Sequence, residues 1–250
     1  MHIIFGNYGN ETVALMQWVA ERTLPAVYVV SIDTGWAAQG WQRQVERGEA
    51  LAKRYGFTVV NLQAKLDFAA LIEQRQGFPS TKHQWCAGFL KGLTLLDWLD
   101  SVDPQCEAVI LLGKRRAKSR ALAGLPEFIA ESEHYDERKV WHPLYTCSER
   151  SLFDLLERAA IPALPHRSLE CDPCVNNTPG NFLRMQANEI RKTARLEKKL
   201  GKAMFAPTGY GNSQGIEQVI QWVKKQNKSA TVGTTEMSDL GCGSPFACGL

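Results

Sequence analysis

The sequence predicts an α/β protein in which a parallel open sheet is flanked by helices. Short apolar runs of strand length alternate with longer segments of helical periodicity over roughly the first 60 residues. Strand, helix and strand at this spacing indicate parallel strands joined by right-handed crossovers. Beyond residue 179 no further strand pattern follows. We therefore expect an α/β domain over residues 1–178 and a helical extension with a cysteine-bearing tail over residues 179–250.

The first half of the α/β domain is clearly divided by turn residues. The opening apolar run stops at Gly6, and the helix after it has an apolar side that includes Leu15 and Val19. A charged amphipathic segment closes at Gly56, as helices often do. We expect strands at residues 2–5, 25–32 and 57–61, with helices at residues 11–22 and 39–55.

The second half of the chain is mainly helical. Asp67 is a suitable N-cap, because its carboxylate can accept a backbone N–H of the first turn. Leucines recur at helical spacing from Leu90 to Leu99, and an apolar run precedes Gly113. We expect helices at residues 67–75, 86–99, 149–160, 181–200 and 214–225, a strand at 107–112 and a short edge strand at 139–144.

Composition limits the class of protein. The chain has 250 residues, of which 44% are hydrophobic, and a formal net charge of +3, enough for a sizeable core. Its N-terminus lacks the basic-then-apolar pattern of a secretion signal, and no run is apolar enough to span a membrane. We therefore expect a cytoplasmic protein without a membrane partner, and we also expect a homo-oligomer.

Seven cysteines are present, an odd number. Reduced or metal-bound thiols are expected in the cytoplasm rather than disulfides. Cys171 and Cys174 are separated by Asp-Pro, which favours a turn that points both sulfurs the same way. Such a pair can bind a metal ion or an iron–sulfur cluster, act as a redox dithiol, or simply be buried. Cys86, Cys242 and Cys248 are possible additional ligands, whereas Cys106 and Cys147 have no partner at ligand spacing.

Polar residues follow three of the expected strands. In an open parallel sheet, ligands bind at the carboxyl ends of the strands. The first loop, residues 7–12, leads into a helix whose N-terminus can hold phosphate or sulfate oxygens. Asp33 and Thr34 follow the second strand. Five cations follow the fourth strand, where guanidinium groups suit oxyanions, although a solvated face is the ordinary alternative: Lys114, Arg115, Arg116, Lys118 and Arg120.

Several short segments occur in a recognisable order: Tyr8-Gly9-Asn10-Glu11, Asp33-Thr34-Gly35, Trp85-Cys86 with Lys91, Gly113-x-Arg115-Arg116-x-x-Ser119-Arg120, and Arg167-Ser168-x-x-Cys171-x-x-Cys174. Over roughly residues 3–176 the chain resembles the phosphoadenosine phosphosulfate reductase family. That family belongs to the wider group of adenine-nucleotide α-hydrolase-like proteins. The resemblance implies the same open parallel sheet, with a nucleotide-binding domain over residues 1–178.

The resemblance also implies a nucleotide site, a [4Fe–4S] cluster and a nucleophile. A loop after the first strand and an arginine loop would hold adenosine phosphosulfate or ATP. Cys248, in a Cys-Gly-Leu tail, would be the catalytic thiolate. The expected nucleotide-binding residues are Asn7, Tyr8, Gly9, Asn10, Glu11, Thr12, Asp33, Thr34, Gly35, Lys82, Gly113, Arg115, Arg116, Ser119 and Arg120. The expected cluster ligands are Cys86, Cys171, Cys174 and Cys242.

The chain also departs from the family pattern. Trp85-Cys86 stands where cluster-bearing reductases have two adjacent cysteines, and Cys242 could supply the missing sulfur. The gap between Cys174 and Cys248 is long and contains a basic helix. The loop at residues 7–12 also lacks the full Ser-Gly-Gly-x-Asp-Ser of ATP-splitting relatives.

Three functional hypotheses follow from these patterns. The first is a sulfonucleotide reductase that uses a thioredoxin-like reductant. The second is an ATP-dependent sulfurtransferase, supplied by a sulfide donor, that thiolates a nucleobase or another small molecule. The basic helix could then lie along a nucleic-acid backbone, through Arg191, Lys192, Arg195, Lys198 and Lys199. The third is a nucleotide-binding regulator without catalytic activity.

Overall fold

The fold is given by a computed structural model that describes residues 1–205, 214–229 and 244–246. Its centre is a six-stranded sheet with the order β3-β2-β1-β4-β6-β5. All neighbouring pairs are parallel except β5 and β6, so the predicted α/β class with an open, mainly parallel sheet is confirmed. The strands are β1 (His2–Phe5), β2 (Val27–Asp33), β3 (Thr58–Gln63), β4 (Val109–Leu111), β5 (Phe128–Ser132) and β6 (Arg138–Trp141).

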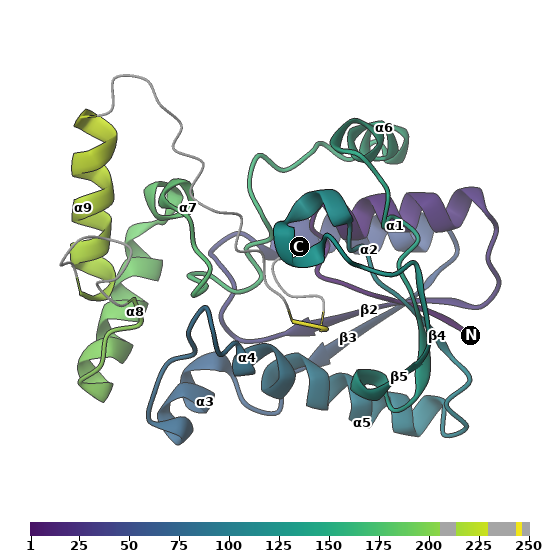
Figure 1. Ribbon diagram of the computed structural model, residues 1–250, viewed down its shortest axis with the longest axis horizontal. Helices are drawn as coiled ribbons and strands as arrows, with labels where there is room; N and C mark the ends of the chain where they lie inside the picture. Colours follow the sequence, from purple (N-terminus) through teal and green to yellow (C-terminus); the bar gives the residue numbers. More distant parts are fainter. Residues whose placement is uncertain (206–213, 230–243, 247–250) are drawn as a thin grey trace.

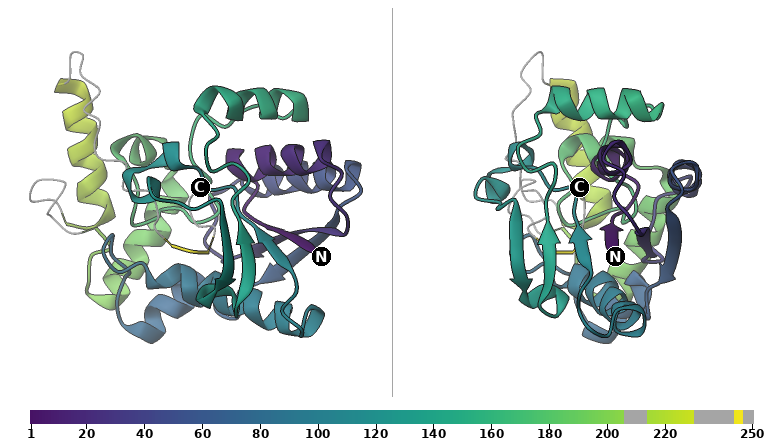
Figure 2. Two further views of the ribbon diagram at one scale, coloured as in Figure 1. Left: turned by 45° about the vertical axis from the view of Figure 1, so that its right-hand side comes forward. Right: turned by 90° about the vertical axis from the view of Figure 1, so that its right-hand side faces the viewer.

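Helices cover both faces of the sheet, as Figures 1 and 2 show. One face carries α1 (Asn10–Glu21), α2 (Gln42–Arg54) and α6 (Glu149–Ala159). The other carries α3 (Phe68–Arg75), the short α4 (Trp85–Ala87), a π-helical turn η1 (Gly88–Gly92) and α5 (Leu93–Val102). Burying apolar side chains against both faces is what stabilises a parallel sheet of this kind.

Local sequence explains where these helices begin and end. Asp67 caps α3 as predicted, because its Oδ1 accepts the backbone N–H of Ala70 at 2.7 Å. Ser148 caps α6 in the same way through the N–H of Ser151. Short 3₁₀ turns, η2 (Arg116–Lys118), η3 (Arg120–Leu122) and η4 (Glu133–Tyr135), connect the strands near the far edge of the sheet.

Three helices follow the sheet and lie beyond the carboxyl ends of β2 and β3 (Figure 1): α7 (Pro179–Arg184), α8 (Ala187–Leu200) and α9 (Gly215–Ser229). The prediction of one continuous helix over residues 181–200 is wrong. The helix breaks at Met185 and Gln186, because Gln186 and Glu189 form a capping box that starts α8 anew. Whether residues 1–178 and 179–250 are separate domains stays a prediction.

The far edge of the sheet also differs from the prediction. The strand predicted at residues 139–144 is not an edge strand, because β6 pairs with β4 on one side and β5 on the other. The edge is β5, which sequence patterns did not predict. Its residues are mostly exposed and do not alternate between apolar and polar, so the period-two signal of a half-buried strand is absent.

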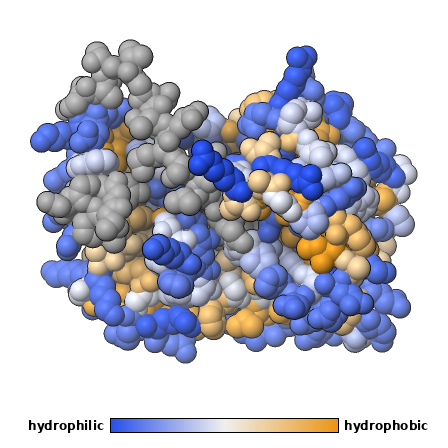
Figure 3. All heavy atoms as spheres, viewed as in Figure 1, coloured by the Kyte–Doolittle hydropathy of each residue, from blue (hydrophilic) through white to orange (hydrophobic). Residues whose placement is uncertain are grey.

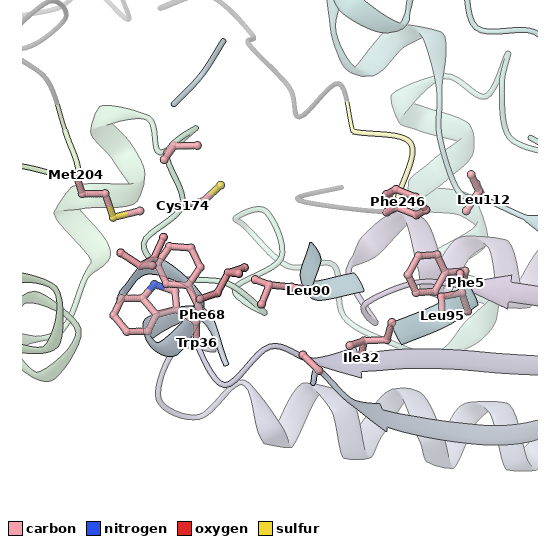
Figure 4. Packing of buried hydrophobic residues seen from close by; sticks show 14 of the residues in the cluster. Phe5, Ile32, Trp36, Phe68, Leu90, Leu95, Leu112, Cys174, Met204 and Phe246 are labelled. Atoms are coloured by element: carbon pink, nitrogen blue, oxygen red, sulfur yellow. The ribbon is translucent and has the colours of Figure 1, made fainter. Parts of the chain in front are cut away.

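The hydrophobic core forms two clusters, one on each face of the sheet. The larger cluster runs from Phe5 and Ile32 past Phe68 to Cys174 and Phe246, as Figure 4 shows. It therefore joins the strands to the cysteine-containing loop and to the described part of the tail. Among the residues that the structure describes, no helix combines the length and hydropathy needed to cross a membrane.

Candidate functional site

A pocket of about 380 Å³ lies at the carboxyl ends of β1, β2 and β3. This is the position at which open parallel sheets bind ligands. Its walls combine aromatic and aliphatic side chains with amides and carboxylates. The lining residues are Asn7, Tyr8, Ser31, Ile32, Asp33, Ala37, Ala38, Gly40, Trp41, Gln42, Val45, Glu49, Asn61, Leu62, Gln63 and Glu170.

The loop after β1 is held in shape by Asn7, which is buried. Its Oδ1 accepts the backbone N–H of Gly9 at 2.9 Å, and its backbone N–H donates to Thr12 Oγ1 at 3.2 Å. Gly9 is the N-cap residue of α1, and it has no side chain that could accept an N–H of the first turn. α1 therefore begins directly after this loop, with the buried carboxylate of Glu11 in its first turn, and backbone N–H groups at a helix N-terminus favour an anionic group.

Tyr8 borders the pocket and is completely buried. Its φ of 59° lies in the left-handed region, and Gln44 Nε2 donates to its carbonyl oxygen at 2.9 Å. The ring packs so closely on Gly48 of α2 that a Cβ there would lie 2.1 Å from a ring carbon. Burial, with a smaller contribution from the charge of Glu49, raises the pKa of Tyr8 well above its ordinary value. The phenol therefore stays neutral.

Glu170 connects the pocket to the cysteine-containing loop. Its carboxylate Oε1 accepts Asn7 Nδ2 at 2.8 Å and lies 2.6 Å from Lys91 Nζ, and its carbonyl oxygen accepts Thr34 Oγ1 at 3.2 Å. The side chains of Lys91 and Glu170 are 3% and 8% exposed. Lys91 lies in η1, and π-helical turns are frequent at functional sites. The segments after β1 and β2, the helix that carries Cys86 and the loop that carries Cys171 therefore meet at Glu170.

Backbone hydrogen bonds dock the cysteine-containing loop on the segment after β2. Ala38 N donates to Leu169 O at 2.9 Å, and Asp172 N donates to Trp36 O at 2.9 Å. Trp36 Nε1 in turn donates to Pro173 O at 3.2 Å. These bonds hold the loop next to the pocket, which Glu170 lines.

Cations surround the two thiols of this loop. Burial would lower the pKa of Arg167, but the charges of Cys174, Asp172 and Cys171 outweigh it and raise that pKa. Burial lowers the pKa of Lys192, and the charge of Cys171 opposes this shift. Arg167 and Lys192 are therefore close enough to these thiols to interact with them electrostatically.

The segment that carries Cys86 lies beside the cysteine-containing loop. Gln84 Nε2 contacts Asn176 Oδ1 at 3.3 Å, and Cys86, Cys171 and Cys174 all belong to or pack on one hydrophobic cluster. Within residues 1–205, 214–229 and 244–246, the structure gathers no three His, Cys, Asp or Glu side chains at metal-binding distance. The predicted ligand Cys242 lies outside the described residues.

The predicted arginine loop is only partly exposed. Arg115 is buried, and its Nη2 lies 3.3 Å from Glu11 Oε1 and 2.9 Å from Glu149 Oε2. Lys118 Nζ lies 2.9 Å from the same Glu11 oxygen. Burial would raise the pKa of Glu11, but Lys118 and Arg115 outweigh it and hold the pKa below its ordinary value. Binding of a nucleotide by Arg115 remains a prediction, and it would require that side chain to leave Glu11 or Glu149.

The other predicted residues of this region lie around that ion pair. Gly113 is required by close packing, because a Cβ there would lie 2.7 Å from the carbonyl oxygen of Glu11. Ser119 Oγ is buried without a hydrogen-bond partner in the structure. Arg116, Arg120 and Lys82 are exposed, and Arg116 Nε donates to Leu125 O at 2.7 Å. The cations available at the surface of this loop are therefore Arg116 and Arg120 rather than Arg115.

The residues predicted after β2 lie at the rim of the pocket. Asp33 is exposed, and its Oδ1 accepts the backbone N–H of Gly35 at 2.8 Å. Gly35 has a φ of 65°, and a Cβ there would lie 2.5 Å from Asp67 Cβ, so this turn requires glycine. The side-chain amide of Asn10 makes two hydrogen bonds with the backbone of Leu164: Nδ2 donates to the carbonyl oxygen, and Oδ1 accepts the N–H. These bonds connect the start of α1 to the segment before the cysteine-containing loop.

The tail is docked at residues 244–246, close to the carboxyl end of β4. Lys114 Nζ donates to Ser244 O at 2.8 Å, and Tyr135 Oη donates to Pro245 O at 2.9 Å. The Phe246 ring packs on Gly92 of η1, where a Cβ would lie 2.7 Å from the ring, and on Tyr135. Figure 4 shows Phe246 within the same buried cluster as Phe5 and Leu112. The predicted nucleophile Cys248 lies outside the described residues.

Several residues of the site were not selected from the sequence. Glu170, Glu49 and Asn61 line the pocket, but no sequence motif used above marks any of them as a binding residue. Lys91 was singled out with Trp85-Cys86 in the sequence, but it was not among the expected binding residues. The face of the molecule seen in Figure 3 carries mainly hydrophilic residues, with apolar areas between them.

Comparison with known proteins gives the following results. The sequence matches no protein-family model, and no curated protein matches it in sequence. Solved structures with a similar fold include a phosphoadenylyl-sulfate reductase from Candida auris, at 14% identity and a TM-score of 0.44, over 64% of this chain and 74% of that one. The U34-tRNA thiolase NcsA from Methanococcus maripaludis, with a [4Fe-4S] cluster, matches at 12% identity and a TM-score of 0.46, over 96% and 76%. An NH3-dependent NAD synthetase from Campylobacter jejuni matches at 11% identity and a TM-score of 0.41, over 94% and 88%. Likeness of this extent assigns neither an activity nor a ligand to this chain.

Proposed function

We propose that this chain is an enzyme that acts on an adenylyl-activated sulfur substrate, in the manner of a sulfonucleotide reductase. One observation carries the proposal. Glu170 lines the pocket and also directly precedes Cys171, so the pocket and the thiols share one buried junction. A nucleotide in the pocket would therefore lie beside the cysteine-containing loop.

The pocket suits a nucleoside. Trp41 and Leu62 offer apolar surface to a base, while Asn61 and Asp33 offer hydrogen-bonding groups to a ribose. The 5′-phosphate would then extend toward the N-terminus of α1, where backbone N–H groups favour an anion. The exposed Arg116 and Arg120 would neutralise the rest of the phosphosulfate.

The proposed chemistry uses Cys248 as the nucleophile. Its thiolate attacks the sulfate sulfur, the bond between sulfur and the bridging phosphate oxygen breaks, and AMP or its 3′-phosphate leaves with the electron pair. The product is an S-sulfocysteine. A dithiol such as thioredoxin then attacks the cysteine sulfur, releases sulfite and becomes a mixed disulfide, which its second thiol resolves.

We further propose that Cys86, Cys171, Cys174 and Cys242 hold a [4Fe–4S] cluster. The proposal is supported by the types and order of the donors, because two thiols share one turn, a third lies on the adjacent segment, and the cations Arg167 and Lys192 lie near that turn. When bound, the cluster would adjust the electrostatics of the site rather than carry electrons. The chain's own residues would bind the nucleotide and supply the attacking thiolate.

Anaerobic purification followed by assays on adenylyl sulfate, its 3′-phosphate and ATP tests this proposal. We expect a brown protein with about four irons per chain, and sulfite release that Cys248→Ala abolishes without weakening nucleotide binding. Cys106→Ala is the matched control, because Cys106 is not among the proposed ligands. Unchanged sulfite release in Cys248→Ala would rule out the role of that thiol.

A second candidate function is favoured by α8. Arg191, Arg195 and Lys198 are exposed at helical spacing on one face. The two glutamates of α8 point inward, where Glu189 accepts the N–H of Gln39 and Glu197 accepts the N–H of Met204. An exposed basic face of this kind suits a polyanion such as a nucleic-acid backbone.

The second candidate is therefore an ATP-dependent sulfurtransferase acting on a nucleobase. A carbonyl oxygen of the acceptor would attack the α-phosphorus of ATP and expel pyrophosphate. Sulfide from a donor would then attack the activated carbon, and AMP would leave with the former carbonyl oxygen. The proton that the hydrosulfide brings in would be released to solvent, which leaves a neutral thiocarbonyl product.

Filter binding of single-stranded RNA and DNA across salt concentrations tests this candidate. Changing Arg191, Arg195 and Lys198 together to Gln should lower the slope of log K against log salt by about 2, because three phosphate contacts are lost. The same change at three exposed cations on other elements, Arg43, Lys139 and Arg150, is the control. Absent or salt-insensitive binding would exclude a nucleic-acid partner.

A further inference from the structure

The charge of the pocket bears on which adenine nucleotide it accepts. Its described lining contains three carboxylates, those of Asp33, Glu49 and Glu170, and no Lys, Arg or His. Among the residues that the structure describes, a buried cation pairs with one of these three carboxylates, since Lys91 Nζ lies 2.6 Å from Glu170. Glu49 pairs with Lys53 at 3.8 Å, and the side chain of that lysine is exposed. The pocket is therefore electrostatically negative along its β2, β3 and α2 walls.

The two remaining carboxylates stand where a ribose would make its contacts. Glu49 Oε1 accepts Asn61 Nδ2, and Asn61 Oδ1 accepts Ser31 Oγ at 2.8 Å, so a polar chain runs across the wall formed by α2, β3 and β2. Asp33 is exposed at the end of β2, with one oxygen on Gly35 N. Carboxylate oxygens accept hydrogen bonds from hydroxyl groups and repel phosphate oxygens.

We infer that the pocket selects adenosine 5′-phosphate derivatives with a free 3′-hydroxyl, such as adenylyl sulfate or ATP, and rejects their 3′-phosphorylated forms. This inference rests on the proposed function, because it takes the pocket to hold the nucleoside. A 3′-phosphate carries close to two negative charges at pH 7. It would meet Asp33 and Glu49 at short range with no cation among the described lining residues to neutralise it.

Titration calorimetry with AMP and with adenosine 3′,5′-bisphosphate tests the inference directly, because the two ligands differ only in the 3′ group. We expect AMP to bind at least tenfold more tightly, a difference of about 1.4 kcal/mol. The double variant Asp33→Asn and Glu49→Gln should bring the ratio of the two dissociation constants close to one. Both amides keep the oxygens that accept Gly35 N and Asn61 Nδ2.

A charge added to the pocket gives an independent test. Gln63 lines the pocket and is exposed, so Gln63→Lys should fold normally and should raise the affinity for the bisphosphate at least tenfold. Equal affinities of the unmodified protein for both ligands, or tighter binding of the bisphosphate, would overturn the inference and leave the proposed function standing. Failure of AMP, adenylyl sulfate and ATP to bind at all would overturn the proposed function, and the inference with it.

Discussion

Replacing Glu170 by Gln tests the junction between the pocket and the cysteine-containing loop. The change keeps the size of the side chain and an oxygen that can accept Asn7 Nδ2, but it removes the charge that faces Lys91. The ammonium and carboxylate are 2.6 Å apart, and both side chains are more than nine-tenths buried. Desolvated charges of this kind depend strongly on one another.

The expected loss follows from that burial. Removing one partner of a buried ion pair costs roughly 3–5 kcal/mol. Because the amide oxygen of Gln can still accept a hydrogen bond from Lys91, we expect the lower end, about 3 kcal/mol. For a chain of this length, each kcal/mol lowers the melting temperature by about 2–4 °C, so Glu170→Gln should lower it by roughly 6–12 °C.

Calorimetric or spectroscopic melting with a matched control provides the assay. Glu73→Gln removes the charge from a pair of similar length, since Lys199 Nζ lies 2.7 Å from Glu73, but these side chains are 64% and 37% exposed. Exposed pairs contribute at most about 1 kcal/mol. If Glu170→Gln lowered the melting temperature no more than Glu73→Gln does, Glu170 would not be the buried junction described above.

Two further predictions concern other parts of the structure. His142 is buried with Nδ1 on Pro126 O at 2.8 Å, and burial lowers its pKa to about 4. The unfolded chain takes up that proton near pH 6.5, so stability should fall by about 3 kcal/mol as the pH drops from 6.5 to 4. Urea unfolding at pH 7 and pH 4.5 should show a smaller loss in His142→Gln, and equal losses would contradict the assignment. Phe246→Ala should raise hydrogen exchange at the backbone amides of residues 244 and 246 by about 100-fold, because the buried ring contributes roughly 3 kcal/mol. Exchange unchanged there would show that the ring does not hold the tail.

Much of the sheet could be predicted because its strands are short and apolar. β1, β2 and β4 are largely buried, so each appears in the sequence as a compact hydrophobic run. β3 is an edge strand and only partly buried, but its Val59 and Val60 still give an apolar run. β5 has no such signal, since it is an exposed edge strand. The break before α8 was missed because Gln186 is an uncommon N-cap residue, and only the folded capping box reveals it.

The site was predictable to the extent that topology determines it. Carboxyl ends of parallel strands meet at one edge, so Asn7 and Asp33 could be placed there from the sequence. The ion pair between Glu11 and Arg115 could not, because the two residues are 104 positions apart. A basic cluster that pairs with buried carboxylates looks the same in sequence as one that binds an anion. The sequence likewise gives no sign that Glu170 belongs to the site, because its contacts with Asn7 and Lys91 are visible only in the folded structure.

Nucleotide binding at the carboxyl ends of β1, β2 and β3 is best tested by calorimetric titration of adenylyl sulfate into the full chain and into Ala38→Trp. Ala38 lines the pocket, so an indole there would fill it, whereas Ala130→Trp adds the same bulk on the exposed edge strand β5. We predict one nucleotide per chain for the unmodified protein and for Ala130→Trp, and at least a tenfold loss of affinity for Ala38→Trp, equal to about 1.4 kcal/mol. Equal affinity in all three proteins would contradict the placement of the nucleotide in this pocket.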